Sequence, residues 1–115
     1  MNEAFTVEFL TDAIDDLRQI ITTFKMLGSR NGAVRINEKI LKAANQLSTF
    51  PYSAPVVPDS KISASGFRMI CVEQYLMFYK LFESEKKIVI YRILNGKRNY
   101  PTLMNRLKSE YNDEE

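Results

Sequence analysis

The sequence predicts an α+β domain in which a helical hairpin packs on a twisted antiparallel sheet, with a short helix at the C-terminus. Residues 5–9 alternate apolar and polar side chains, as a half-buried strand does. Two longer stretches with helical spacing follow, separated only by a short polar turn. Three apolar segments joined by tight turns come next, which favours an antiparallel meander. The expected order is therefore β-α-α-β-β-β-α.

The first helix is expected to begin after Thr11 and to end at Gly28. Thr11 is a suitable N-cap, and aspartates in the following turns lie where the helix dipole favours negative charge. Gly28 is a natural stop because glycine adopts the left-handed conformation that ends many helices. The apolar positions recur three and four residues apart: Ile14, Leu17, Ile20, Ile21, Phe24 and Leu27.

The second helix follows the polar turn 29–32 and is expected to end at Pro51, which cannot continue a helix. A connection of about four residues forces two helices to run antiparallel as a hairpin. The apolar stripe of this helix again has helical spacing: Ile36, Ile40, Ala43, Ala44, Leu47 and Phe50.

The second half of the chain is expected to form the meander. Residues 51–65 are rich in proline and serine and read as a loop. Strands are predicted at 67–73, 75–82 and 87–94, and the last two are so apolar that they should be central. Pro101 suits a helix start, with Leu103, Leu107 and Tyr111 spaced four apart. One domain over 1–111 is expected, followed by a disordered acidic tail at 112–115.

Composition excludes several kinds of chemistry. The chain of 115 residues has no histidine and one cysteine, which excludes Ser-His-Asp triads and His/Cys metal sites, so no cofactor and no metal are expected. Cys71 lies in an apolar segment and is expected to be buried. No apolar run is long enough to span a bilayer and the start lacks a signal-peptide pattern, so a cytoplasmic protein without membrane contact is expected. Ten of the 16 Lys and Arg residues lie between Lys61 and Lys108, which favours anionic partners.

Four local patterns, in the right order on the expected elements, resemble the RelE/ParE superfamily of bacterial toxins. The first is Leu10-Thr11-Asp12-Ala13-Ile14-Asp15-Asp16-Leu17, where a strand passes into a helix. The second, Leu47-Ser48-Thr49-Phe50-Pro51, closes the hairpin. The third is Phe67-Arg68-Met69-Ile70 followed by Tyr75-Leu76-Met77-Phe78-Tyr79. The fourth is Tyr91-Arg92-Ile93-Leu94-Asn95-Gly96-Lys97-Arg98-Asn99-Tyr100, with Asn95 where the family pattern has histidine and Asn99 where it has aspartate.

The resemblance implies a growth-arresting toxin of a type II toxin–antitoxin system, held inactive by a cognate antitoxin in a hetero-oligomer. Members of the ParE type poison DNA gyrase, whereas members of the RelE type cut messenger RNA on the ribosome. The long hairpin and residues 92–98 and 100–104 are more similar to the ParE type, so gyrase is the preferred target. Ribosome-dependent RNA cleavage, and a family member that only binds a protein partner without toxicity, are the alternatives.

Each activity implies its own site. If the protein is a ribonuclease, Arg68 and Arg98 match phosphate-holding arginines of the RelE type, and arginine binds phosphate bidentately. Lys61 would then be the base, and Tyr100 or Tyr91 would stack on a base or supply a proton. Metal-free cleavage needs cations around the scissile phosphate. A gyrase poison instead needs a target-binding surface, for which we expect Lys97, Arg98, Tyr100, Arg106 and Lys108.

The antitoxin is expected to cover apolar and aromatic side chains that the sheet leaves exposed, namely Phe78, Tyr79 and Phe82, with an acidic amphipathic segment that folds on binding. Several candidates also have purely structural interpretations. Arg68 would then face solvent, and Tyr79 would belong to the core. Arg92 shares a strand face with Ile88 and Ile90, and a structural ion pair with Asp15 or Asp16 is the favoured interpretation.

Overall fold

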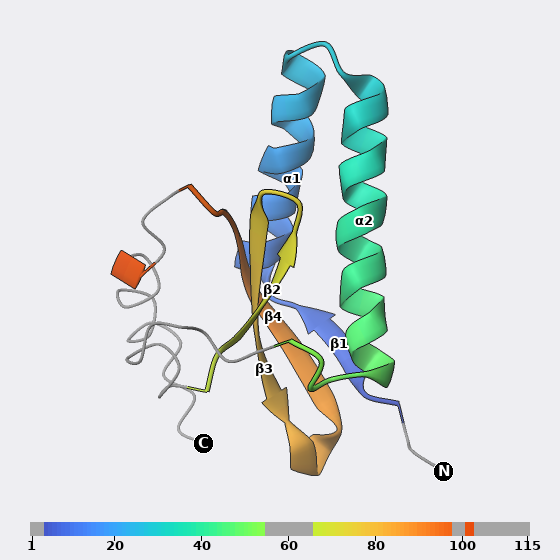
Figure 1. The fold of residues 1–115 in the computed structure, drawn as a ribbon, viewed down its shortest axis with the longest axis vertical. Coiled ribbons are helices and arrows are strands. Elements are labelled where there is room, and N and C mark those ends of the chain that lie inside the picture. The colour runs from blue at the N-terminus through green and yellow to red at the C-terminus, as the bar shows by residue number, and fades with distance from the viewer. Residues whose placement is uncertain (1–3, 55–65, 98–100, 103–115) are drawn as a thin grey trace.

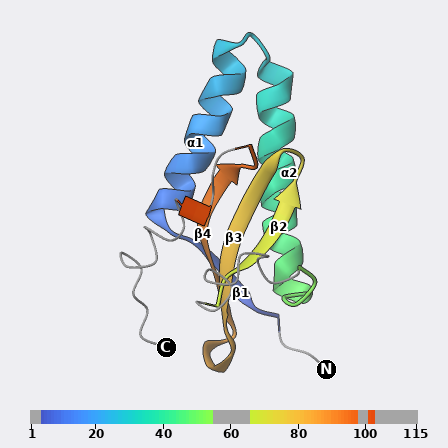
Figure 2. The same cartoon turned by 60° about the vertical axis from the view of Figure 1, so that its left-hand side comes forward.

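A computed structural model of the chain describes residues 4–54, 66–97 and 101–102. A hairpin of two long helices covers one face of a four-stranded sheet and projects beyond the end of that sheet (Figures 1 and 2). This arrangement confirms the predicted α+β class. The elements are β1 (Thr6–Phe9), α1 (Thr11–Met26), α2 (Arg30–Thr49), β2 (Arg68–Val72), β3 (Tyr75–Phe82), a short 3-10 helix (Glu83–Glu85) and β4 (Lys87–Asn95). Pro101 and Thr102 are helical, at the predicted start of the last helix.

The sheet has the order β1-β4-β3-β2, with the two apolar strands β3 and β4 at its centre as predicted. Strands β2, β3 and β4 form the expected antiparallel meander. β1, in contrast, pairs parallel to β4, so the sheet is mixed rather than wholly antiparallel. The cause is the hairpin, which returns the chain to the end at which it started: the Phe5 N–H donates to the Ser48 carbonyl over 2.9 Å. β2 starts at this same end of the sheet and therefore runs in the direction of β1. β4 also runs in that direction, because β2 and β4 are both antiparallel to β3.

The ends of the helices follow local chemistry, with two corrections. α2 begins at Arg30, inside the stretch 29–32 that was predicted to be a turn. Ser29 caps α2, because its hydroxyl accepts a hydrogen bond from the Gly32 N–H over 3.1 Å. Thr11 is not the N-cap that the sequence predicted. Leu10 has that position, without a side-chain cap, because its own N–H still pairs with the Ile90 carbonyl as an extension of β1. Gly28 ends the turn after α1 with φ of 83°, as predicted.

β4 contains a bulge, and the side chains of the sheet form one apolar cluster on each of its faces. Phe78 pairs with Arg92 but its neighbour Tyr79 pairs with Ile90, so Tyr91 is an extra residue on β4. The helix-side core is the larger of two apolar clusters and includes Ile36, Ile40, Leu47, Met77, Tyr79, Ile88, Ile90 and Ile93. An outer cluster on the opposite face contains Phe67, Phe78, Val89, Tyr91 and Leu94.

Candidate functional site

The basic turn that follows β4 is held in place by its own backbone and by the turn between β2 and β3. The Asn95 side-chain oxygen accepts a hydrogen bond from the Lys97 N–H over 2.9 Å, which closes a local turn. The Gly96 N–H donates to the Gln74 carbonyl over 2.7 Å, and a Cβ at position 96 would lie only 3.1 Å from that oxygen. Lys97 is exposed at the tip. Asn95, which stands where the family pattern has histidine, therefore has a turn-forming role.

Asp16 of α1 anchors β4 immediately before this turn. Its carboxylate accepts from Nε and Nη2 of Arg92 over 2.6 and 2.9 Å, and from the Ile93 N–H over 2.9 Å. The ion pair predicted for Arg92 is thereby confirmed, with Asp16 as the partner. β1 stops pairing at Ile90, so the Ile93 N–H faces an edge of β4 beside which the described residues place no further strand. The Asp16 carboxylate supplies the acceptor that a further residue of β1 would have given.

A pocket of about 170 Å³ lies between α1 and this open edge of β4. Its walls include Asp16 and Thr23 from α1, Tyr75 from β3, and Ile93 and Asn95 from β4. Burial raises the pKa of the Tyr75 phenol, and the negative charge of Glu73 raises it further, so Tyr75 is a neutral hydrogen-bonding group here. The described residues that line the pocket are polar or apolar and include no cation, so this part of the lining does not suit a phosphate.

Arg68, a predicted phosphate ligand, has internal partners. Its Nη1 donates to the Ala54 carbonyl over 2.7 Å, and its guanidinium carbon lies 5.2 Å from the centre of the Tyr52 ring. Tyr79, opposite Arg68 in the sheet, donates its hydroxyl to the Pro51 carbonyl over 3.1 Å. The Arg68 guanidinium and the Tyr79 hydroxyl thus hold the turn that follows α2 in place. Arg68 does not simply face solvent.

Tyr79 is suited to this anchoring role because it stays protonated. Burial raises the pKa of its phenol, and the positive charge of Arg68 offsets only part of that rise. A proton is therefore present for the bond to Pro51 throughout the neutral range. Arg68 and Lys97 lie at opposite ends of the β2–β3 hairpin, because the Gln74 turn that contacts Gly96 follows β2 whereas Arg68 begins it. The distance along the strand is roughly 16 Å.

The expectation that Phe78 and Tyr79 are exposed is wrong. Tyr79 lies in the helix-side core and Phe78 in the outer cluster, both with 0% exposure, because an apolar central strand is covered on both of its faces. Phe82 is half-buried at the end of β3. The predicted burial of Cys71 is also wrong: the thiol is exposed, because β2 is an edge strand. Lys61, Arg98, Tyr100, Arg106 and Lys108 lie outside the described residues.

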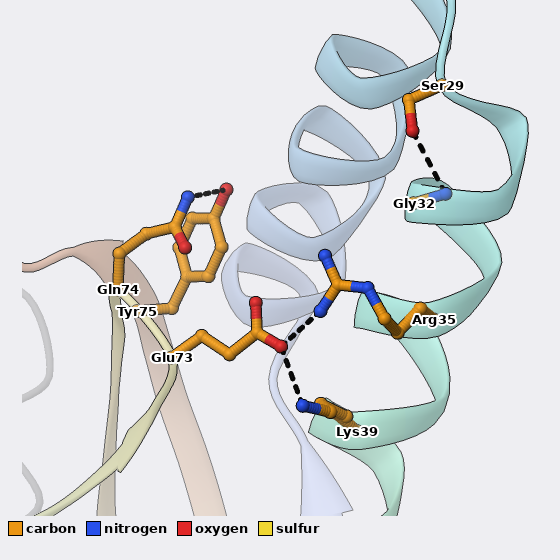
Figure 3. A network of polar contacts seen from close by, with 7 residues as sticks. All are labelled: Ser29, Gly32, Arg35, Lys39, Glu73, Gln74 and Tyr75. Atoms are coloured by element: carbon orange, nitrogen blue, oxygen red, sulfur yellow. Dashed lines mark hydrogen bonds and ion pairs between the residues drawn. The ribbon is translucent and has the colours of Figure 1, made fainter.

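One ionic cluster was missed by sequence reasoning. Glu73, in the turn between β2 and β3, reaches across to α2, where Arg35 and Lys39 contact the same carboxylate oxygen (Figure 3). The Lys39 Nζ lies 2.8 Å from that oxygen. The hydrogen bond from Lys39, helped by the charge of Arg35, lowers the pKa of Glu73 against the opposing effect of burial. The spacing of Arg35 and Lys39, four apart on one helix flank, is the only sequence signal for it.

Two further features concern the described part of the chain alone. No helix in it is long and apolar enough to cross a membrane. Nor do its acidic and cysteine side chains gather in a group of three or more that could hold a metal ion.

Comparisons with known proteins identify the family. A family model described as the ParE toxin of type II toxin–antitoxin systems, parDE, matches residues 7–100. Among solved structures, the chromosomal ParDE toxin–antitoxin system from P. aeruginosa superposes with a TM-score of 0.63 at 19% identity, over 82% of this chain and 98% of that chain. The RelBE2 toxin–antitoxin complex from Mycobacterium tuberculosis gives a TM-score of 0.59 at 21% identity, over 80% and 98%. No curated protein matches the sequence.

Proposed function

Because this chain belongs to the ParE toxin family, and is thus the toxin of a type II toxin–antitoxin system, we propose that it arrests bacterial growth by inhibiting DNA gyrase. We further propose that a cognate antitoxin neutralises it by forming a hetero-oligomer with it. The family model that matches is that of ParE, the type of toxin to which the sequence motifs are more similar. The two solved relatives, ParDE and RelBE2, are toxin–antitoxin systems and support the antitoxin partner.

The observation that favours gyrase over RNA cleavage is the placement of Arg68. A metal-free ribonuclease needs preorganised cations on the scissile phosphate. Arg68 instead donates to the Ala54 carbonyl and stacks over Tyr52. The chain also has no histidine to act as a general base at neutral pH. Inhibition of gyrase requires no such constellation, only a surface that binds the target.

The surface we assign to the target is the basic turn and the segment after it. Lys97 is exposed at the tip of a turn that Asn95, Gly96 and Gln74 fix in place, so a partner meets it in a preorganised form. The other residues of the proposed surface are Arg98, Tyr100, Arg106 and Lys108. Aromatic and arginine side chains commonly dominate the binding energy of such surfaces.

Two assays run in parallel test the proposal. The protein, made by cell-free synthesis, is added to a gyrase supercoiling reaction and to ribosomes that translate a defined message. We expect the unmodified protein to inhibit supercoiling and to leave the message uncut. The Arg68→Gln variant, provided that it folds, should inhibit gyrase as well. Position-specific cuts in the message that Arg68→Gln abolishes would establish the ribonuclease instead. Full growth at high expression of the folded protein would indicate a family member that only binds a partner.

A further inference from the structure

The backbone of the turn between β2 and β3 is strained at Glu73. Glu73 and Gln74 are the two central residues of this turn, because Val72 pairs with Tyr75 on either side of them. Glu73 has a φ of 56°, in the left-handed region that residues with a Cβ rarely adopt, whereas the φ of Gln74 is not positive. Glycine is the usual first central residue of a two-residue turn of this form. The chain places a carboxylate where glycine would relax the backbone.

Two cations of α2 hold that carboxylate. Arg35 and Lys39 lie one helical turn apart, and both contact the same oxygen of Glu73 (Figure 3). The Glu73 side chain is 25% exposed. The Glu85 side chain, which contacts Lys87 over 3.2 Å in the turn at the other end of β3, is 57% exposed. The contacts of Glu73 are therefore the less hydrated of the two, and they tie the β2–β3 turn to α2.

The same turn also holds the basic turn that follows β4. The Gln74 carbonyl accepts the Gly96 N–H over 2.7 Å, and Lys97 comes next in the chain. A Cβ at position 96 would lie 3.1 Å from that carbonyl oxygen, so the two turns are in close contact. Because two soft dihedral angles per residue place each peptide group, the left-handed conformation of Glu73 determines where the Gln74 carbonyl lies.

We propose that Glu73 is a positioning residue for the basic turn that presents Lys97. Its ion pairs tie the β2–β3 turn to α2, and the Gln74 carbonyl passes that constraint to the basic turn. Both helices of the hairpin then fix the basic turn, because Asp16 of α1 anchors β4 immediately before it. A partner meets Lys97 on a backbone that is already ordered, which lowers the entropic cost of binding. In assigning Lys97 to the target surface, the inference rests on the proposed function.

Hydrogen exchange of the isotope-labelled full chain, followed by nuclear magnetic resonance, tests the tether without any target. The reporter is the Gly96 amide, which donates to Gln74 and, in a surface turn, exchanges by local opening rather than by global unfolding. Glu73→Gln should speed its exchange roughly threefold to tenfold, because two exposed ion contacts are lost. Glu85→Gln, which removes an ion pair at the opposite turn, is the matched control and should leave it unchanged. No change in Glu73→Gln, or an equal change in both variants, refutes the tether.

Two further variants identify the cause of the effect. Glu73→Lys combined with Arg35→Glu and Lys39→Glu rebuilds the contacts with reversed charges and should return the exchange of Gly96 to within about twofold of the original rate. Exchange that stays fast would show that the ionic contacts are not the cause. Glu73→Gly relaxes the left-handed backbone but makes no ion pair, so exchange should still rise. Exchange as slow as in the unmodified protein would show that the backbone alone positions the turn, against the proposal.

A supercoiling assay then links the tether to the target. Glu73→Gln should raise the concentration that half-inhibits gyrase about threefold, because part of the ordering cost moves to the binding step. The charge-reversed triple variant should recover inhibition, and Glu85→Gln should retain it. Unchanged inhibition by Glu73→Gln, despite faster exchange at Gly96, would refute the positioning role. If the unmodified protein does not inhibit gyrase, the proposed function fails, while hydrogen exchange still decides whether the tether exists.

Discussion

Asp16 joins two elements, α1 and β4, through one carboxylate. It pairs with Arg92, accepts the otherwise unpaired N–H of Ile93, and lies in the second turn of α1. The side chains of Asp16 and Arg92 are 13% and 19% exposed, so this pair is largely withdrawn from water. The bulge at Tyr91 immediately precedes Arg92 on β4.

Asp16→Ala should destabilise the fold by about 2–4 kcal/mol, because it leaves a poorly solvated guanidinium and a backbone N–H without their acceptor. Asp16→Asn keeps an acceptor for Ile93 and should cost less. The measurement is urea denaturation of the purified variants. Asp15→Ala is the control, because the pair that Asp15 forms with Arg18 at 3.8 Å is exposed, and its loss should change stability by less than about 0.5 kcal/mol. Equal losses in Asp15→Ala and Asp16→Ala would contradict the assigned role.

The helices illustrate what sequence reasoning captures and where it fails. Apolar spacing located both helices and Gly28 located the end of the first, because these signals are local. The cap of α1 was wrong, because the strand pairing of Leu10 decides where the helix begins and that pairing involves β4, far along the chain. Ser29 was included in a turn, and its capping bond to Gly32 was not anticipated.

Two matched substitutions separate the true cap from the expected one. Ser29→Ala removes the hydroxyl that accepts from Gly32 and should cost about 1 kcal/mol, the usual loss for an N-cap. Thr11→Ala should cost almost nothing, because Thr11 is the first helical residue and makes no capping bond. Chemical denaturation of both variants beside the unmodified protein measures the difference. A larger loss for Thr11→Ala than for Ser29→Ala would reverse the assignment.

The tie between α2 and the β2–β3 turn should depend on pH. The pKa of Glu73 is lowered in the folded state, so the folded protein holds this carboxylate ionised at a pH where the unfolded chain begins to take up a proton. The resulting stabilisation is present above the ordinary glutamate pKa of 4.5 and is lost as the pH falls through the lower value of the folded state.

The stability difference between the unmodified protein and Glu73→Gln should therefore shrink as the pH falls below about 4.5, the ordinary pKa of a glutamate. Urea midpoints at several pH values from neutral downward give that difference. Glu83→Gln is the control for general acid effects, because Glu83 is exposed in the 3-10 helix. A difference for Glu73→Gln that stays constant over the whole range would show that the contacts with Arg35 and Lys39 contribute nothing through charge.

The molecule as a whole divides into parts that local patterns predict and parts that only topology determines. The meander and its two central strands follow from apolar content and short turns. The parallel pairing of β1 and the exposure of Cys71 on an edge strand depend on the order of strands in space. The same holds for the candidate site. The ion pair of Asp16 and Arg92 could be predicted from their opposite charges. The partners of Arg68 could not be predicted, because they lie in a turn that no sequence motif marks.

Removal of the chain's C-terminal part should separate the two candidate mechanisms. If the toxin binds gyrase through its basic turn and the following segment, deletion of residues 101–115 should raise the concentration that half-inhibits supercoiling at least about tenfold. The reason is that loss of a few dominant contact residues costs 2 kcal/mol or more. Arg68→Ala should have the smaller effect, because Arg68 contacts the turn after α2 and lies outside the proposed target surface.

Two full-length double variants test whether the deletion acts only by unfolding the protein. Arg106→Glu combined with Lys108→Glu should weaken inhibition as the deletion does, while circular dichroism and the melting temperature stay close to those of the unmodified protein. Arg18→Glu combined with Lys25→Glu makes the same change of charge on the exposed face of α1 and should leave inhibition unchanged. If both double variants lose inhibition equally, gyrase senses only overall charge. If Arg68→Ala proves more harmful than the deletion, the target surface lies at the other end of the β2–β3 hairpin.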